Sequence, residues 1–103
     1  LCGDEITIKL VINNQKIIDF GYQGKSCVYC QATASILSDK LISRETKKIK
    51  DLCDYAYFYF SENQKNLKKE WKFLSKLLSQ KNASRQQCIL LPFNALKKIV
   101  SKL

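Results

Sequence analysis

The sequence predicts an α+β domain in which a small antiparallel β-sheet, formed by an N-terminal β-hairpin, carries helices packed on one face. Apolar and polar residues alternate over residues 5–12 and again over residues 16–22, which is the period of half-buried strands. From residue 28 onward the apolar residues recur at the spacing of amphipathic helices. Because the strands come first and the helices follow, we expect the helices to lie together on one side of the sheet.

The hairpin is predicted to consist of these two strands and a tight turn. In the first strand one face is apolar and the other polar, with Ile6, Ile8, Leu10 and Ile12 opposite Glu5, Thr7 and Lys9. The dipeptide Asn13-Asn14 suits the turn, because Asn tolerates the left-handed backbone that tight hairpin turns require. In the second strand we expect one face to hold Ile18, Phe20 and Tyr22 and the other to hold Ile17 and Asp19.

Three helical segments are predicted in the middle of the chain. The first runs from about residue 28 to Ile42, and small residues at 31–35 leave room beside Cys27, allow close packing on the sheet, or do both. Residues 45–60 and 65–80 each carry an apolar stripe at helical spacing. The stripes consist of Ile49, Leu52, Cys53, Ala56, Tyr59 and Phe60, and of Leu67, Trp71, Leu74, Leu77 and Leu78. The aromatic run at 55–60 is interpreted as core.

The last part of the chain is predicted to be a loop followed by a helix. Residues 82–87 are polar, Cys88 follows them, and Pro92 stands near the helix start, where its missing N–H is not needed. The inward side of this helix would hold Phe93, Leu96, Val100 and Leu103. No linker or repeat interrupts the sequence, so we expect one domain over residues 1–103. The chain begins at Leu1 and contains no Met, from which we expect that an N-terminal segment is missing.

The net charge of +9 comes almost wholly from lysine, with sixteen Lys against two Arg. Proteins that read nucleic acids tend to use Arg for bidentate contacts, so nucleic acid is not an expected partner. The lysines lie mostly on the polar side of the helical pattern and are interpreted as solvated surface, with docking of an acidic partner as the alternative. No apolar run approaches the roughly 18 residues that span a bilayer, so we expect no membrane partner.

Five cysteines in a chain without histidine are the most specific feature of the sequence. An odd number cannot all pair within the chain, and without a secretory context we expect reduced thiols and a cytoplasmic location. Cys53 lies on an apolar stripe and is interpreted as a small core residue. Cys2, Cys27 and Cys88 stand instead where regular elements meet loops. The hairpin and the last helix can therefore bring these three thiols to one point, where Asp4 can add an oxygen ligand.

Three thiolates and a carboxylate suit a tetrahedral zinc ion, and they also suit a 2Fe–2S cluster. Thiolates bind soft metals and accept sulfur, so these residues indicate chemistry rather than packing. A carboxylate is a poorer cluster ligand than a thiolate, which would make a cluster labile, as a carrier needs.

Three blocks of sequence surround the candidate cysteines. The first is Cys2-Gly3-Asp4, and the second is Gly24-Lys25-Ser26-Cys27 with Gln31-Ala32-Thr33-Ala34-Ser35 behind it. The third is Arg85-Gln86-Gln87-Cys88, followed by Ile89-Leu90-Leu91-Pro92. In their order and spacing these blocks resemble the U-type iron–sulfur scaffold family (NifU, IscU and SufU), which implies a SufE/NifU-like fold.

The resemblance implies an accessory scaffold or carrier rather than an enzyme with its own turnover. A cysteine desulfurase would deliver persulfide sulfur to Cys88 in a scaffold mode, or to Cys2 in a zinc-dependent relay mode. The implied cluster ligands are Cys2, Cys27 and Cys88, and a zinc ion would take Asp4 as well. A 2Fe–2S cluster would be assembled and passed to apo iron–sulfur proteins. The alternatives are a zinc-bound sulfurtransferase accessory to the desulfurase, and an inert structural zinc or protein-interaction module.

Several details favour the SufU-like branch of that family. The interval from Cys27 to Cys88 is long, and Gln87 stands where IscU-type members have His. The Leu-Pro-Pro-Val-Lys chaperone motif of IscU-type members is absent. Three positions depart from the family pattern. Ser26 replaces the second glycine of the turn, Gln87 replaces the basic residue that is common before the third cysteine in SufU proteins, and Cys30 creates a Cys27-x-x-Cys30 pair. That pair could form a disulfide or supply an alternative ligand, or Cys30 could occupy a position where any small residue is tolerated.

Overall fold

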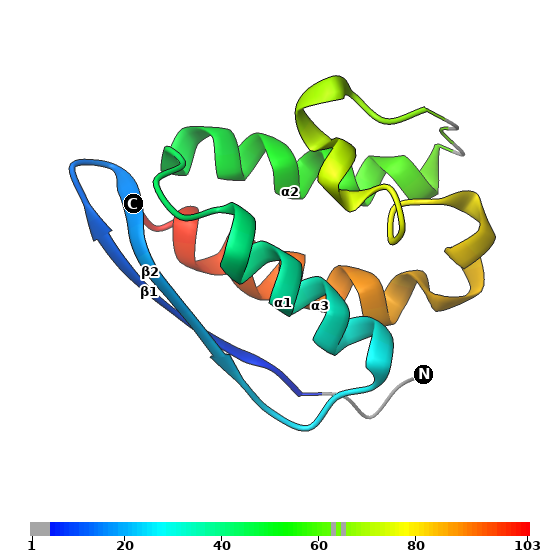
Figure 1. The fold of residues 1–103 in the computed structure, drawn as a ribbon, viewed down its shortest axis with the longest axis horizontal. Helices are drawn as coiled ribbons and strands as arrows, with labels where there is room; N and C mark the ends of the chain where they lie inside the picture. Colours follow the sequence, from blue (N-terminus) through cyan, green and yellow to red (C-terminus); the bar gives the residue numbers. More distant parts are fainter. Residues whose placement is uncertain (1–4, 63, 65) are drawn as a thin grey trace.

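The computed structural model describes residues 5–62, 64 and 66–103, which form a β-hairpin followed by helices (Figure 1). The elements in chain order are β1 (Thr7–Asn13), β2 (Lys16–Gln23), α1 (Val28–Lys40), α2 (Thr46–Ser61), the 3₁₀ helices η1 (Lys69–Leu74) and η2 (Gln80–Arg85), and α3 (Gln86–Val100). In the part of the chain that the structure describes, no helix is long and apolar enough to cross a membrane.

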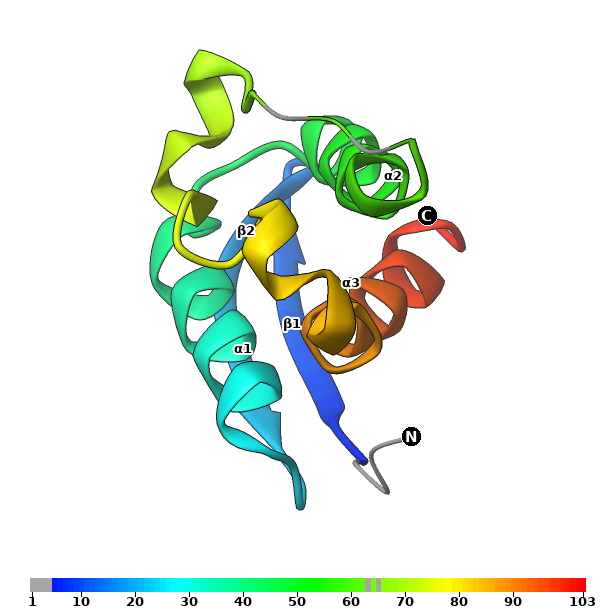
Figure 2. The same cartoon turned by 90° about the vertical axis from the view of Figure 1, so that its right-hand side faces the viewer.

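The helices cover one face of the two-stranded antiparallel sheet, as expected for the α+β class. Helix α1 packs against β2, α3 packs against β1 and against α1, and α2 packs on α3. Figure 2 shows α1 and α3 side by side over the hairpin, with α2 at the upper edge. The core lies between these layers and includes the fully buried residues Ile17, Leu37, Leu41, Ile49, Leu52, Ile89 and Leu96.

The hairpin differs from the sequence prediction at its turn and in its second strand. The turn is formed by Asn14 and Gln15, with φ of 52° and 63°, because Asn13 already pairs with Lys16. Ile12 pairs with Ile17 and Val11 pairs with Asp19, so Ile18 falls between them as the extra residue of a β-bulge.

The bulge reverses the inward and outward alternation of β2 at this point. Ile17 is fully buried, whereas Ile18 is 52% exposed. Ile17 therefore shares the inward face with Phe20, and the predicted grouping of Ile18 with Phe20 was wrong. Phe20, beyond the bulge, is buried. In β1 the predicted alternation is confirmed, because Ile8 is buried and Thr7 and Lys9 are exposed.

Helix α2 confirms the predicted inward stripe in full. Its buried residues are Ile49, Leu52, Cys53, Ala56, Tyr59 and Phe60. The interpretation of the whole aromatic run as core is wrong, since Tyr57 and Phe58 are 55% and 47% exposed. Successive residues of a helix point about 100° apart, so four consecutive aromatic residues cannot all face the same core.

The segment predicted as one helix over residues 65–80 is not an α-helix. It contains the short 3₁₀ helix η1, and Trp71 inside it has non-helical backbone angles (φ −111°, ψ 16°). The apolar residues Trp71, Leu74, Leu77 and Leu78 are nevertheless buried, as their pattern predicted. Their rings and methyl groups therefore enter the core from irregular backbone, which is a case of tertiary packing overriding local propensity.

Side-chain contacts hold this irregular segment against the helices. The Tyr55 hydroxyl accepts a hydrogen bond from the Lys68 N–H (3.0 Å) and donates one to the Asn66 carbonyl (3.3 Å). The Arg44 guanidinium carbon lies 5.9 Å from the ring centroids of both Trp71 and Phe73. These polar and cation–π contacts fix the path of the segment where no continuous helix does so.

The final helix starts earlier than the sequence predicted. Residues expected to form a loop at 82–87 belong largely to η2, and α3 begins at Gln86, so Cys88 lies inside the helix rather than before it. Pro92 is within α3 and is buried, rather than at its start. Leu103, predicted to face inward, is 62% exposed because the helix ends at Val100.

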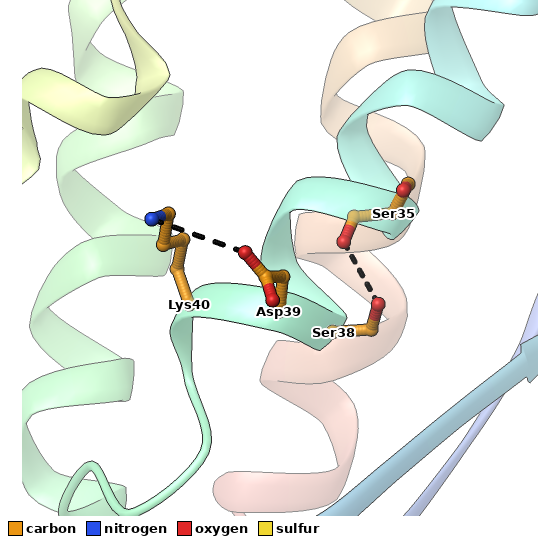
Figure 3. A network of polar contacts seen from close by, with 4 residues as sticks. All are labelled: Ser35, Ser38, Asp39 and Lys40. Carbon is orange, nitrogen blue, oxygen red and sulfur yellow. Dashed lines mark hydrogen bonds and ion pairs between the residues drawn. The ribbon is translucent and has the colours of Figure 1, made fainter.

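The outward side of α1 near its end is polar and solvated. Figure 3 shows the Ser38 hydroxyl directed at Ser35, to whose carbonyl it donates a hydrogen bond of 2.8 Å, and Lys40 beside Asp39 at 3.9 Å. Lys40 lies in the last turn, where a positive charge complements the helix dipole. Such exposed pairs contribute little, so α1 is held mainly by its buried stripe of Cys30, Thr33, Ala34 and Leu37.

The open end of the hairpin closes through a tight backbone contact. The Glu5 N–H donates a hydrogen bond of 2.8 Å to the Lys25 carbonyl. Gly24 has φ of 143°, and a Cβ at this position would collide with the Glu5 carbonyl and come within 3.0 Å of the Ile6 Cα. Only glycine meets both conditions, so Gly24 fixes the course of the chain into residue 27.

We predict that Gly24→Ala lowers the free energy of unfolding by about 1–3 kcal/mol, because the backbone must leave a conformation that an L side chain rarely adopts. Urea unfolding followed by circular dichroism measures the change. Gly21→Ala is the matched control, since a Cβ there meets nothing within 4 Å among the described residues. Its effect is expected to stay within about 0.5 kcal/mol. Equal destabilisation by both substitutions would contradict the role given to Gly24.

Candidate metal and sulfur site

Cys27 stands at the N-terminal end of α1, directly after the loop that Gly24 fixes. It is the N-cap residue, with extended backbone (φ −74°, ψ 172°), and its carbonyl accepts the first helical hydrogen bond from the Gln31 N–H at 3.0 Å. Its side chain is half-buried and makes no capping hydrogen bond. The Cys27 thiol is therefore held at the N-terminal end of a helix and is partly accessible from solvent.

Gln31 ties the loop before Cys27 to the first turn of α1. Its side-chain amide donates to the Ser26 hydroxyl oxygen at 2.5 Å and to the Gly24 carbonyl at 3.5 Å. In the sequence Gln31 stands out only as part of a block of small residues, so this role was not predicted. A side chain with two amide hydrogens four residues after the N-cap was the available signal.

Cys88 lies in the first turn of α3 and is 5% exposed. The two helices that carry Cys27 and Cys88 pack against each other, and their N-terminal ends lie at the same end of the molecule (Figures 1 and 2). A cation–π contact joins these ends, because the Arg85 guanidinium carbon is 5.7 Å from the ring centroid of Tyr29. Two of the predicted site residues thus come from elements that meet at one end of the fold.

Cys2 and Asp4, the other two predicted ligands, lie outside the described residues. Glu5, which follows Asp4 directly, is hydrogen-bonded to Lys25, two residues before Cys27. Among residues 5–62, 64 and 66–103, no three His, Cys, Asp or Glu side chains are grouped closely enough to hold a metal ion. The ligand set of Cys2, Asp4, Cys27 and Cys88 therefore stays a prediction, for which the described part of the chain supplies Cys27 and Cys88.

Two features of the surroundings of Cys27 and Cys88 suit a metal that prefers sulfur ligands. The thiol groups of Cys27 and Cys88 stand on the N-terminal ends of two packed helices, and the first turn of α1 (residues 28–31) has no acidic side chain. The unpaired N–H groups at the start of a helix favour a negative charge such as a thiolate or a persulfide. Zinc and iron–sulfur clusters both take such sulfur ligands.

The two remaining cysteines are buried. Cys53 is 3% exposed on the inward stripe of α2, which confirms its interpretation as a core residue. Burial raises the pKa of the Cys53 thiol to about 12, with the negative charge of Asp54 adding to the shift and Lys97 opposing it. Cys30 is fully buried on the inward stripe of α1, one turn after Cys27.

A polar groove lies beside α2. It has a volume of about 590 Å³ and follows the outer side of α2. Its lining consists of Lys48, Asp51, Asp54, Tyr55, Phe58, Glu62, Gln64, Asn66, Lys68, Glu70 and Trp71. Four of the nine carboxylates of this basic chain line it, which the sequence pattern did not indicate.

The same arrangement of hairpin and helices occurs in solved structures. The chain superimposes on the N-terminal part of a nitrogen-fixing NifU-like protein from Brucella abortus with a TM-score of 0.83 and 21% identity, covering 98% of this chain and 71% of that one. It matches a putative iron–sulfur cluster assembly scaffold protein for the SUF system from Fervidobacterium islandicum with a TM-score of 0.80 and 21% identity, covering 94% and 71%. These similarities define the fold class as NifU-like.

The family of the chain is identified by its amino-acid sequence. Residues 1–58, more than half of the chain, match the family described as the NifU-like N terminal domain. The chain belongs to this family, which confirms the resemblance to the U-type scaffolds.

Two curated relatives align over almost the whole chain. One is the iron–sulfur cluster assembly scaffold protein IscU of Thermotoga maritima, 28% identical over 103 residues, with 99% of this chain and 72% of the relative covered. The other is the protein of the same name from Streptococcus pyogenes, 26% identical, with 98% and 64% covered. The chain thus spans about two thirds to three quarters of the length of these relatives.

We predict that thiol-alkylating reagents at pH 8 modify Cys27 in the folded protein but leave Cys53 unmodified. The thiolate is the reactive form, and a pKa of about 12 leaves only about one Cys53 in ten thousand ionised at this pH. Mass spectrometry of peptides, with and without 6 M guanidinium, identifies the labelled residues. The Cys53→Ala variant should lose one label in denaturant and none in the native state. Loss of a native-state label in this variant would show that Cys53 is accessible.

Proposed function

We propose that this chain is an iron–sulfur cluster assembly scaffold that receives sulfur and assembles a cluster for transfer. The observation that carries the proposal is the placement of Cys27 and Cys88 on the packed N-terminal ends of α1 and α3, in a chain of the NifU-like N-terminal domain family. The relatives from Thermotoga maritima and Streptococcus pyogenes are both named iron–sulfur cluster assembly scaffold proteins, which supports the proposal.

The cluster is the cargo of the site, and Cys2, Cys27 and Cys88 are its proposed ligands. Asp4 is the proposed fourth ligand, and its carboxylate holds iron less firmly than a thiolate does. A 2Fe–2S cluster held by three thiolates and a carboxylate would leave more readily than one held by four thiolates. Gly24 and Gln31 hold the Cys27 loop in place, so the site keeps its shape while cargo enters and leaves.

The proposed source of sulfur is a cysteine desulfurase that carries a persulfide. An acceptor thiolate, Cys88 or Cys2, attacks the outer sulfur of that persulfide, takes it over and leaves the desulfurase with its own thiolate. Apo iron–sulfur proteins are the proposed recipients of the finished cluster. The protein acts in this scheme as an accessory factor, in a reducing compartment such as the cytoplasm where its thiols persist.

A second candidate function is a zinc-bound sulfur relay to the same desulfurase. The absence of histidine from the chain, with Gln87 before Cys88, favours a site made of cysteines and Asp4, which suits tetrahedral zinc. In this mode Cys2 would leave the metal to accept sulfur while Asp4 stays beside it. An inert structural zinc site would bind the same ion but accept no sulfur.

We predict that the chain purified without oxygen and reconstituted with iron and sulfide gains a visible absorption band and transfers the cluster to an apo-ferredoxin. Cys27→Ala and Cys88→Ser should each lose most of this absorption, because each removes one of the sulfur ligands. Cys53→Ala is the matched control and should keep it, since Cys53 lies buried in α2.

The same samples separate the three functions. Transfer to the apo-ferredoxin supports the scaffold. Stimulation of a cysteine desulfurase by the zinc-loaded protein, abolished by Cys2→Ala, supports the relay. A zinc-loaded protein that takes sulfur on none of its cysteines and gains no cluster would refute both and leave the structural zinc site.

A further inference from the structure

Cys27 and Cys30 form a pair of thiols across the first turn of α1. Cys27 is the N-cap residue and Cys30 is the third residue of the helix. Inside a helix, side chains three residues apart are neighbours, with about 5–6 Å between their Cβ atoms, and Cys27 stands one position before this regular part. The extended backbone of Cys27 (ψ 172°) sets it outside the regular helix, so its side chain can turn toward Cys30. Cys-x-x-Cys pairs at such helix starts are the redox-active form of this motif.

The two thiols differ in accessibility. Cys27 is half-buried at the surface, whereas Cys30 has an exposed fraction of 0%. A sulfur donor from outside can therefore load Cys27 but cannot reach Cys30. Once a group is attached to Cys27, the neighbouring thiol of Cys30 is placed to react with it from inside the protein.

Sulfur delivered as a persulfide is not yet in the state that a cluster needs. The outer sulfur of a persulfide must gain two electrons to become sulfide, and those electrons have to come from a reductant. A second thiol beside the persulfide is such a reductant, because two thiols supply two electrons when they form a disulfide.

We propose that Cys30 is the resolving thiol that reduces sulfur carried on Cys27 and releases it as hydrosulfide. The Cys30 sulfur attacks the inner sulfur of the Cys27 persulfide, and a bond forms between Cys27 Sγ and Cys30 Sγ. The bond to the outer sulfur breaks, and this sulfur leaves with the electron pair as hydrosulfide while the Cys30 proton passes to solvent. The pair ends as a disulfide, which a dithiol reductant returns to two thiols for the next round.

This inference deepens the proposed function, because it rests on sulfur arriving at the site and adds the step that makes the sulfur usable. Sulfur first taken up by Cys88 or Cys2 reaches Cys27 by the same exchange, in which the Cys27 thiolate attacks the outer sulfur. The helix start favours the negative charge of the persulfide and of the departing hydrosulfide. The role of Cys30 does not require a bound metal.

The test is a single-turnover experiment without oxygen. The reduced, metal-free protein is mixed with one equivalent of glutathione persulfide, and released sulfide is trapped with monobromobimane. Peptide mass spectrometry then reports the state of Cys27 and Cys30. We expect close to one sulfide per chain and a Cys27–Cys30 disulfide, which is about 2 Da lighter than the two thiols.

Two variants isolate the contribution of Cys30. Cys30→Ala should keep the added sulfur on Cys27, with a mass gain of about 32 Da, and should release at least tenfold less sulfide in the same time. Cys53→Ala is the matched control, since it also removes a buried cysteine, and should behave as the unmodified chain does. Circular dichroism checks that both variants fold.

Three results would overturn the proposal. They are uptake of no sulfur by Cys27, a stable persulfide on Cys27 with no disulfide in the unmodified chain, and equal sulfide release by Cys30→Ala. The disulfide measurement in the unmodified chain decides the matter even if Cys30→Ala does not fold. Repeating the experiment with a cysteine desulfurase and L-cysteine tests the proposed function separately: loading by glutathione persulfide but not by the desulfurase refutes the desulfurase step while leaving the role of Cys30 intact.

Discussion

The contact between Gly24 and the Glu5 carbonyl is the constraint on which the candidate site depends. It closes the open end of the hairpin in a backbone conformation that only glycine adopts without strain, and the Glu5–Lys25 hydrogen bond holds it there. Two consequences follow. The chain is directed into the N-cap of α1 at Cys27, and Glu5 is held beside the loop that leads to this cysteine. From the helix side, the Gln31 side chain donates hydrogen bonds to Gly24 and Ser26 in the same loop. The Cys27 thiol is therefore positioned by the hairpin on one side and by α1 on the other.

The second condition is the packing of α1 against α3, which brings Cys88 to the same end of the fold. Because η2 leads directly into α3, Cys88 lies within a helix turn and its thiol is buried rather than mobile on a loop. Arg85 reaches back over Tyr29 and joins the starts of the two helices. The four cysteines in the described residues fall into two groups. Cys53 is buried in the core under α2. The other three, Cys27, Cys30 and Cys88, lie in the first turns of α1 and α3.

Periodicity predicted the hairpin, the inward stripe of α2 and the α+β class, because burial of one face imposes a regular spacing on the sequence. It failed at Ile17 and Ile18, where a single extra residue in β2 shifts the alternation, and no local residue type marks that bulge. It failed again around Trp71, whose burial is secured by contacts with Arg44 and neighbouring segments rather than by helical backbone. For the site, the motifs identified Cys27 and Cys88, but the roles of Gln31 and Gly24 and the burial of Cys30 depend on three-dimensional contacts.

The central claim is that Cys27 and Cys88 bind one metal or cluster together. X-ray absorption at the edge of the bound metal tests it most directly, because this measurement counts the sulfur neighbours of the metal. We predict a shell dominated by sulfur at about 2.3 Å that loses one sulfur in Cys27→Ala, loses one in Cys88→Ser and stays unchanged in Cys53→Ala. A metal surrounded by nitrogen and oxygen alone, or a sulfur shell that neither of the first two substitutions alters, would contradict the claim.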